Sequence, residues 1–230
     1  MITKSEFSTN LSTVKKQIQD ACDSSDRSLD EVRLLPVTKN WPVEAVSYCM
    51  AHGIVRVGEN RVQEALAKMD VEKGMEFELI GHLQSNKAKL AVGAFNRIQS
   101  IDSSKILNLV GRLAKEKNIV QEVLLQVNAG NDPAKYGIPI EEARQLLEEA
   151  LGISSISVKG FMTIAPYAPN NNEISRQCFS KLRELRDNLA QSYGMKFGEL
   201  SMGMSGDLKE AISEGSTMIR LGSALFGQRL

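Results

Sequence analysis

Apolar residues along the chain gather in short runs that alternate with longer amphipathic stretches. The short runs are rich in Val, Ile, Leu and Phe, and their length is typical of strands that are buried on both faces. The longer stretches repeat apolar residues every three or four positions, which predicts helices that bury one face. The strands we expect are 32–37, 54–57, 77–80, 97–101, 122–127, 156–162, 199–202 and 218–221.

Helical patterns separate these runs almost throughout. Strands that alternate with helices in this way are expected to be parallel, because a parallel connection needs a crossover. Eight such units in 230 residues predict a single α/β domain over residues 1–230, a (β/α)8 barrel with an extra helix ahead of the first strand. The expected helices are 7–22, 42–52, 61–69, 104–117, 140–151 and 173–192, with a weaker pattern at 206–213.

A doubly wound open sheet is the main alternative to the barrel. That fold places a glycine-rich turn after its first strand to hold a dinucleotide. Here the first predicted strand runs into "VTKNWP", which contains no glycine. The barrel is therefore favoured.

Composition excludes several classes of function. Lys plus Arg and Asp plus Glu both number 28, so no overall field favours nucleic acid or an anionic membrane as a partner. Cys22, Cys49 and Cys178 are odd in number and far apart, and two histidines could not complete a structural zinc site with them. With no apolar leader at the start, we expect a cytoplasmic protein without a bound metal.

Polar residues follow every predicted strand. In a (β/α)8 barrel, the residues just past the strands share the face that carries active sites. The sequence therefore predicts a ring of functional groups made of Lys39, Asn60, His82, Asp102, Asn128, Thr163, Ser205 and Arg220.

The last two of these loops indicate a phosphate site. "MGMSGDLKEAI" predicts a strand, a Gly/Ser-rich turn and a helix that begins near Gly206, so that Ser205 lies at a helix N-terminus. "RLGSALFG" adds Gly222 and Ser223 after the last strand. Phosphate sites in such barrels are often built from these two loops.

Lys39 lies on the same predicted rim as this phosphate site. A lysine that is partly desolvated and faces another cation such as Arg220 would expose a neutral amine that can attack an aldehyde. Pyridoxal phosphate carries both an aldehyde and a phosphate. A sugar-phosphate aldolase remains an alternative, although its lysine usually follows a later strand.

Six segments, spread in order between residues 34 and 227, resemble the pyridoxal-phosphate homeostasis proteins, a family similar to the barrel domain of alanine racemase standing alone. The segments are "LLPVTKNWPVEAV", "VGENRVQEALAK", "FELIGHLQSNKAK", "VLLQVNAGNDPAKYGI", "VKGFMTIAP" and "LSMGMSGDLKEAISEGSTMIRLGSALFG".

The resemblance implies roles for individual residues. Lys39 would form the internal aldimine with pyridoxal phosphate, and Ser205, Gly222 and Ser223 would hold its phosphate. Arg220 would face the pyridine nitrogen, with Asn60 and His82 close to the cofactor. Two positions depart from the family pattern, since Trp41 stands where many members have a second lysine and Ser223 where threonine is common.

The resemblance also implies a carrier rather than an enzyme. An arginine stays charged and protonates the ring nitrogen poorly, so the ring would be a weak electron sink. The chain continues only eight residues past Gly222, so we expect no second domain to supply a catalytic tyrosine, and we expect a monomer. The function that follows is buffering pyridoxal phosphate or delivering it to apoenzymes, with effects on amino-acid metabolism. A small racemase and a regulatory binding module remain alternatives.

Overall fold

The structure, a computed structural model, describes residues 2–169 and 171–227. The single-domain prediction also covers residues 1, 170 and 228–230, which lie outside the described residues. Within the described residues, the buried apolar side chains form a continuous cluster that links strands and helices.

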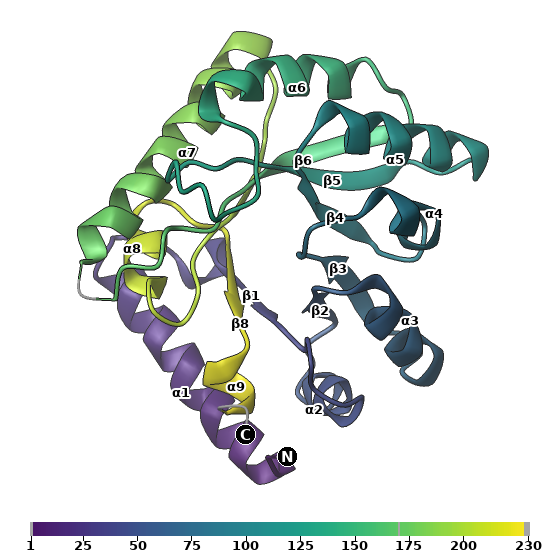
Figure 1. Cartoon of the computed structure of the whole chain (residues 1–230). Helices are drawn as coiled ribbons and strands as arrows, with labels where there is room; N and C mark the ends of the chain where they lie inside the picture. Colours follow the sequence, from purple (N-terminus) through teal and green to yellow (C-terminus); the bar gives the residue numbers. More distant parts are fainter. Residues whose placement is uncertain (1, 170, 228–230) are drawn as a thin grey trace.

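The described residues form a sheet of eight parallel strands, which confirms the predicted fold class. Neighbours in this sheet follow the order β1-β8-β7-β6-β5-β4-β3-β2, and helices surround the ring of strands (Figure 1). The strands are β1 (Arg33–Pro36), β2 (Arg56–Glu59), β3 (Glu76–Leu79), β4 (Arg97–Ile101), β5 (Gln121–Gln126), β6 (Ile156–Met162), β7 (Glu199–Ser201) and β8 (Met218–Leu221).

The helices occupy nearly the predicted positions. They are α1 (Lys4–Asp23), α2 (Glu44–Ala51), α3 (Val62–Val71), α4 (Ala88–Ala91), α5 (Ser104–Glu116), α6 (Ala143–Leu151), α7 (Asn172–Tyr193), α8 (Leu208–Ser213) and α9 (Ser223–Phe226). The sequence did not predict α4 and α9, because an element of four residues is too short to show a helical period. Helix α8 begins two residues later than predicted, so Ser205 and Gly206 lie in a turn before it.

The ring closes unevenly at one junction. β1 and β8 pair in register from Arg33 with Met218 to Pro36 with Leu221. Between β1 and β2, by contrast, the described residues form no ladder, and an isolated parallel bridge joins Val37 to Gly58. The junction between β1 and β2 is therefore the most sparsely bonded part of the ring.

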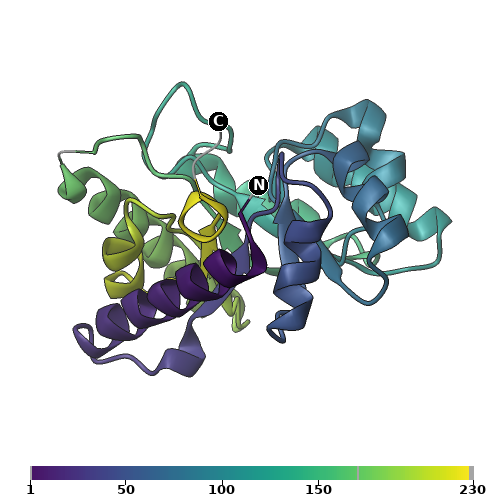
Figure 2. The ribbon, with the colours of Figure 1, turned by 90° about the horizontal axis from the view of Figure 1, so that it is seen from below.

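The extra N-terminal helix covers the side of the barrel that carries α8 and α9. Thr3 caps α1 through a capping box with Glu6, which satisfies backbone N–H groups at the start of the helix. α1 then packs against α8 and α9 (Figures 1 and 2). Phe7 is fully buried in this contact, where its ring stacks on that of Phe226 at 5.3 Å.

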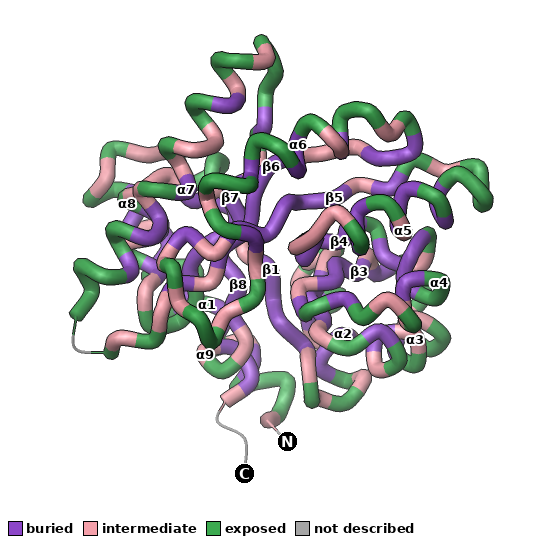
Figure 3. Tube along the Cα trace, turned by 45° about the horizontal axis from the view of Figure 1, so that its top comes forward, coloured by how far each residue is buried: buried purple, intermediate pink, exposed green. Residues whose placement is uncertain are grey.

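Burial follows the expected layers. The strands are buried almost throughout, and the helices expose one face to solvent (Figure 3). Across the described residues, no helix combines the length and the apolar character that crossing a membrane requires.

Candidate functional site

A cavity of about 720 Å³ opens at the carboxyl ends of the strands. This volume lies within the range of small-molecule sites in proteins. Six of the seven residues to which the family resemblance assigns a place at the cofactor line this cavity: Lys39, Asn60, Ser205, Arg220, Gly222 and Ser223.

Lys39 lies in a tight turn immediately after β1. The backbone N–H of Trp41 donates to the carbonyl oxygen of Thr38 at 3.0 Å, which closes the turn around Lys39 and Asn40. Asn40 has φ of 59°, a left-handed conformation that asparagine tolerates better than most residues. The side chain of Lys39 is half-buried and lines the cavity.

The two loops of the predicted phosphate site line the same cavity. Ser205 and Gly206 lie in the turn ahead of α8, and the carboxylate of Asp207 accepts a hydrogen bond from the Met204 N–H at 2.6 Å, which holds this turn. Gly222 precedes α9, and the first backbone N–H groups of a helix have no acceptor within it. The hydroxyls of Ser205 and Ser223 and these backbone groups are suitable donors for an anion.

Arg220 lies at the base of the cavity and is 4% exposed. Its guanidinium donates to the Ser201 hydroxyl at 2.9 Å and to the Thr163 carbonyl oxygen at 2.8 Å. Burial lowers the pKa of Arg220 to about 10, against a smaller opposing effect of Asp207. The side chain therefore stays positively charged at neutral pH, and Ser201 and Thr163 hold its guanidinium group in place.

A hydrogen-bonded chain behind Arg220 runs through the barrel interior. The Ser201 hydroxyl donates to Gln99 Oε1 at 2.6 Å, and Gln99 Nε2 donates to Glu78 Oε2 at 2.6 Å. Ser201 is on β7 and Gln99 on β4, which are not neighbours in the sheet, so this bond crosses the inside of the barrel. Ser201 and Gln99 were not predicted from the sequence, because nothing in the sequence indicates which polar residues of a strand face the barrel interior.

His82 does not line the cavity, and neither do Asp102, Asn128 and Thr163 of the predicted ring. The Nδ1 of His82 lies 2.7 Å from Asp102 Oδ2, and its ring stacks on that of Tyr136 with 4.1 Å between centroids. These two partners hold the imidazole outside the lining of the cavity. His82 therefore does not line the cavity in this structure, and its place beside the cofactor stays a prediction.

Other residues line the cavity without having been assigned to the site. Lys135, from the loop after β5, contributes a second amine, and Asp207 contributes a carboxyl group whose pKa is raised by burial. Asp207 could have been found from its place in "SMGMSGD" beside Ser205. Trp41 packs against Phe226 of α9, with ring centroids 5.9 Å apart, and forms part of the wall.

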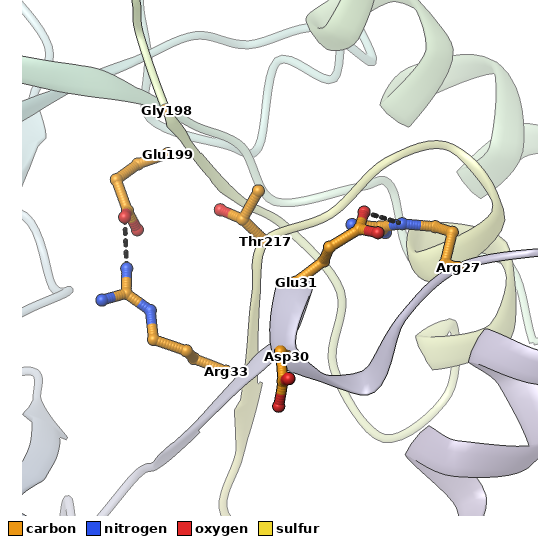
Figure 4. Close-up of a pocket in the computed structure, with 7 residues that line it drawn as sticks. All are labelled: Arg27, Asp30, Glu31, Arg33, Gly198, Glu199 and Thr217. Carbon is orange, nitrogen blue, oxygen red and sulfur yellow. Dashed lines mark hydrogen bonds and ion pairs between the residues drawn. The ribbon is translucent and has the colours of Figure 1, made fainter.

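A second cavity, of about 400 Å³, lies at the opposite end of the barrel (Figure 4). Four of its charged side chains form two ion pairs, Arg33 with Glu199 and Arg27 with Glu31. Arg27 also donates to the carbonyl oxygens of Ile212 and Ser216 at 2.8 and 2.7 Å. These contacts join β1 and the segment before it to the residues around β7 and β8, which indicates a structural role for this end of the barrel.

Fold and site together define a class of protein: a (β/α)8 barrel with a lysine after its first strand and Gly/Ser loops after its seventh and eighth strands, all lining one cavity. The family model "Alanine racemase, N-terminal domain" matches residues 9–230. A pyridoxal phosphate homeostasis protein of Aquifex aeolicus is 40% identical over 95% of this chain and 96% of its own length. This chain belongs to the pyridoxal phosphate homeostasis protein family.

Solved structures agree with this assignment. PipY of Synechococcus elongatus PCC7942, in the form with bound PLP, matches with a TM-score of 0.80 and 34% identity, over 91% of this chain and all of PipY. An alanine racemase of Clostridium difficile 630 matches with a TM-score of 0.81 at 14% identity, over 98% of this chain and 57% of the racemase. The second similarity concerns the fold alone.

Proposed function

We propose that this protein binds pyridoxal phosphate at the cavity above the barrel, with Lys39 as its covalent anchor, and serves as a carrier in pyridoxal phosphate homeostasis. The observation that carries this proposal is the convergence of Lys39, Arg220 and the two Gly/Ser loops on one cavity. The bound PLP in PipY supports the identity of the ligand.

The residues present fit the three chemical features of pyridoxal phosphate. The phosphate is expected to bind Ser205, Ser223 and the backbone at Gly222, and the pyridine nitrogen is expected to face Arg220. When bound, pyridoxal phosphate supplies an electrophilic aldehyde. The neutral Lys39 Nζ attacks the aldehyde carbon, a C=N bond replaces the C=O bond, and the carbonyl oxygen leaves as water with the two protons of the amine.

Arg220 supports a carrier rather than a catalyst. A proton on the ring nitrogen strengthens such a ring as an electron sink, and a guanidinium that remains charged supplies one poorly, which argues against broad carbanion chemistry. Its fork is already bound to Ser201 and Thr163, so its remaining N–H groups can only donate to the ring nitrogen. We therefore propose that the protein buffers or delivers the aldehyde as a monomeric, cytoplasmic protein without robust turnover, with pyridoxal-phosphate-dependent apoenzymes as its recipients.

Borohydride trapping tests the covalent anchor. Purified protein mixed with pyridoxal phosphate and reduced should carry one adduct, located on the Lys39 peptide by mass spectrometry, and Lys39→Ala should abolish it. Lys135→Ala is the matched control, because Lys135 is the other lysine that lines the cavity. An adduct that persists on the Lys39→Ala protein, or one that is lost with Lys135→Ala, contradicts the assignment.

The carrier role has a separate test. The loaded protein is incubated with each L-amino acid in deuterated water, and the α-proton is followed by NMR. We expect no sustained exchange. Exchange at turnover rates would identify an enzyme, with a racemase as the first candidate.

A further inference from the structure

The motif "GENRVQEALAK", residues 58–68, contributes more to the site than the one residue that lines the cavity. Asn60 lies in the cavity wall, whereas Glu59, Glu64 and Lys68 do not. Glu59 is fully buried and Lys68 is 5% exposed. Nothing in the proposed binding of pyridoxal phosphate accounts for three charged side chains at these positions.

Lys68 forms hydrogen bonds both to the carbonyl group of Thr38 and to the two glutamates. Its ammonium donates to Thr38 O at 2.7 Å, to Glu59 Oε1 at 2.6 Å and to Glu64 Oε1 at 2.9 Å. An ammonium has three N–H donors, and here each has an acceptor. The Thr38 hydroxyl also donates to Glu59 Oε1, at 2.6 Å. Both the backbone and the side chain of Thr38 are thus fixed.

Glu64 extends the same cluster to the other side of Lys39. Its Oε1, which accepts from Lys68, also accepts a hydrogen bond from the backbone N–H of Asn40. Thr38 and Asn40 are the two chain neighbours of Lys39. The cluster therefore holds the backbone of the lysine turn before and after the lysine itself.

This cluster lies directly after the point where the hydrogen bonds between β1 and β2 end. The junction of β1 and β2 ends in the Val37–Gly58 bridge and the hydrogen bond from the Thr38 N–H to the Gly58 carbonyl oxygen at 3.0 Å. Beyond that point the sheet contributes nothing more to the position of Lys39. The contacts of Glu59, Glu64 and Lys68 begin at Thr38, directly after the last bond of the sheet.

Stability alone is a weak reason for such a cluster. A buried ion pair is often no more stabilising than well-packed apolar residues of similar volume. A cluster that fixes the direction of one particular side chain, however, gains from directional bonds that apolar contacts do not provide. We infer that Lys68, together with Glu59 and Glu64, positions Lys39 for its bond to the aldehyde of pyridoxal phosphate, an inference that rests on the proposed function.

The chemical reason is geometric. The phosphate loops and Arg220 would hold the phosphate and the pyridine nitrogen of the ligand. The aldehyde carbon would therefore occupy a fixed position in the cavity. Nζ of Lys39 must reach that place from its own backbone. A displacement of about 1 Å in a reacting group can cost about a hundredfold in rate. Loosening the lysine turn should therefore slow bond formation more than it weakens binding of the ligand.

Substitutions at Glu64 test this inference with little risk to folding, because its side chain is 21% exposed and the Lys68–Glu59 pair stays intact. Glu64→Ala removes the acceptor for the Asn40 N–H, and Glu64→Gln keeps a carbonyl oxygen there. Glu116→Ala is the matched control, since Glu116 also forms an i,i+4 ion pair on a helix, with Arg112, but is far more exposed. Lys68→Met removes all three bonds of the ammonium.

Two measurements separate positioning from binding. The rate of adduct formation on Lys39 is followed by rapid mixing with pyridoxal phosphate, borohydride quenching and mass spectrometry. Binding of pyridoxamine phosphate, which has the ring and the phosphate but an amine in place of the aldehyde, is measured by calorimetry. We expect Glu64→Ala to slow adduct formation at least about tenfold, with Lys68→Met slower still. We expect Glu64→Gln and Glu116→Ala to remain near the wild-type rate, and pyridoxamine phosphate to bind all four variants as it binds the wild type.

A wild-type adduct rate in the Glu64→Ala protein would overturn the inference. So would a slow rate accompanied by an equal loss of pyridoxamine phosphate binding, because that result would mean general damage to the cavity. If the wild-type protein itself forms no adduct on Lys39, the proposed function fails, and this inference fails with it.

Discussion

Gly81 occupies a position where the backbone of a neighbouring loop leaves no room for a side chain. A Cβ at this position would lie 2.3 Å from the carbonyl oxygen of Asn60, a backbone atom that cannot swing away. Gly81 follows β3, and Asn60 follows β2, so a side chain here would force apart two loops at the rim of the barrel. The glycine in "IGHLQSNK" is therefore required by packing, and Asn60 keeps its place in the cavity wall because of it.

We predict that Gly81→Ala destabilises the protein by about 1–3 kcal/mol, the usual cost of overpacking. Urea denaturation measures the loss in the free energy of unfolding. Gly198→Ala is the control, because a Cβ there would meet no atom within 4 Å. Equal stabilities of the two variants would contradict the packing argument.

Individual residues also show what a sequence can and cannot predict about a site. Lys39, Asn60, Ser205, Arg220, Gly222 and Ser223 were predictable as cavity residues, because each lies at or just past the end of a strand and parallel strands end on one face. His82 also follows a strand, but it pairs with Asp102 and Tyr136, two contacts that no local sequence pattern predicts. Lys68 resembles an ordinary surface charge on a helix until α3 is docked against the end of β1.

Among the elements, α1 is the one outside the repeating pattern, and it supports α9. The side-chain amide of Asn10 donates to the Leu225 carbonyl oxygen at 3.0 Å, and Phe7 stacks on Phe226. α9 begins at Ser223, so the added helix packs behind a segment of the candidate phosphate site. The sequence predicted the existence of α1 but not the element it supports, because α9 is too short to leave a periodic signal.

We predict that Phe7→Ala lowers the free energy of unfolding by about 3–5 kcal/mol, as is typical when a buried aromatic residue is truncated. The same variant should weaken the binding of pyridoxamine phosphate, because α9 loses its support. Urea denaturation and calorimetry provide the two measurements. Lys15→Ala, an exposed position on the same helix, should change neither quantity. Unaltered ligand binding by a destabilised Phe7→Ala protein would show that the packing of α1 does not influence the site.

For the molecule as a whole, the barrel interior is unusual in holding charge. Glu78 is fully buried and lies near Arg97 and Arg56, with Nη1 to carboxylate distances of 3.9 and 3.7 Å. Burial raises the pKa of Glu78, and the two arginines and Gln99 oppose this effect. The folded state therefore binds a proton on Glu78 more tightly than the unfolded state does.

The sign of the resulting pH dependence follows from linkage. With a raised pKa in the folded state, the contribution of Glu78 to stability is fully present below its ordinary value, 4.5, and is lost as the pH rises through the raised value. We predict that Glu78→Gln makes the decline of stability between pH 4.5 and the raised pKa shallower, by at most about 1.4 kcal/mol per pH unit. Gln99 still finds a carbonyl acceptor in this variant.

Urea denaturation at a series of pH values and constant ionic strength measures this slope. Glu76→Gln is the control on the same strand, because the Glu76 side chain is 37% exposed and that of Glu78 is fully buried. Identical slopes for the wild type and Glu78→Gln would show that Glu78 has the same proton affinity in both states.

The pairing of β1 with β8 also determines when the site can form during synthesis. Lys39 follows β1, near the start of the chain, and Ser223 follows β8, near its end. Strand pairs this distant in sequence are slow to form, and β1 cannot acquire its neighbour β8 until residues 218–221 have been synthesised. A growing chain therefore exposes Lys39 long before it contains the loop after β8, and the candidate site is complete only after that loop has been made.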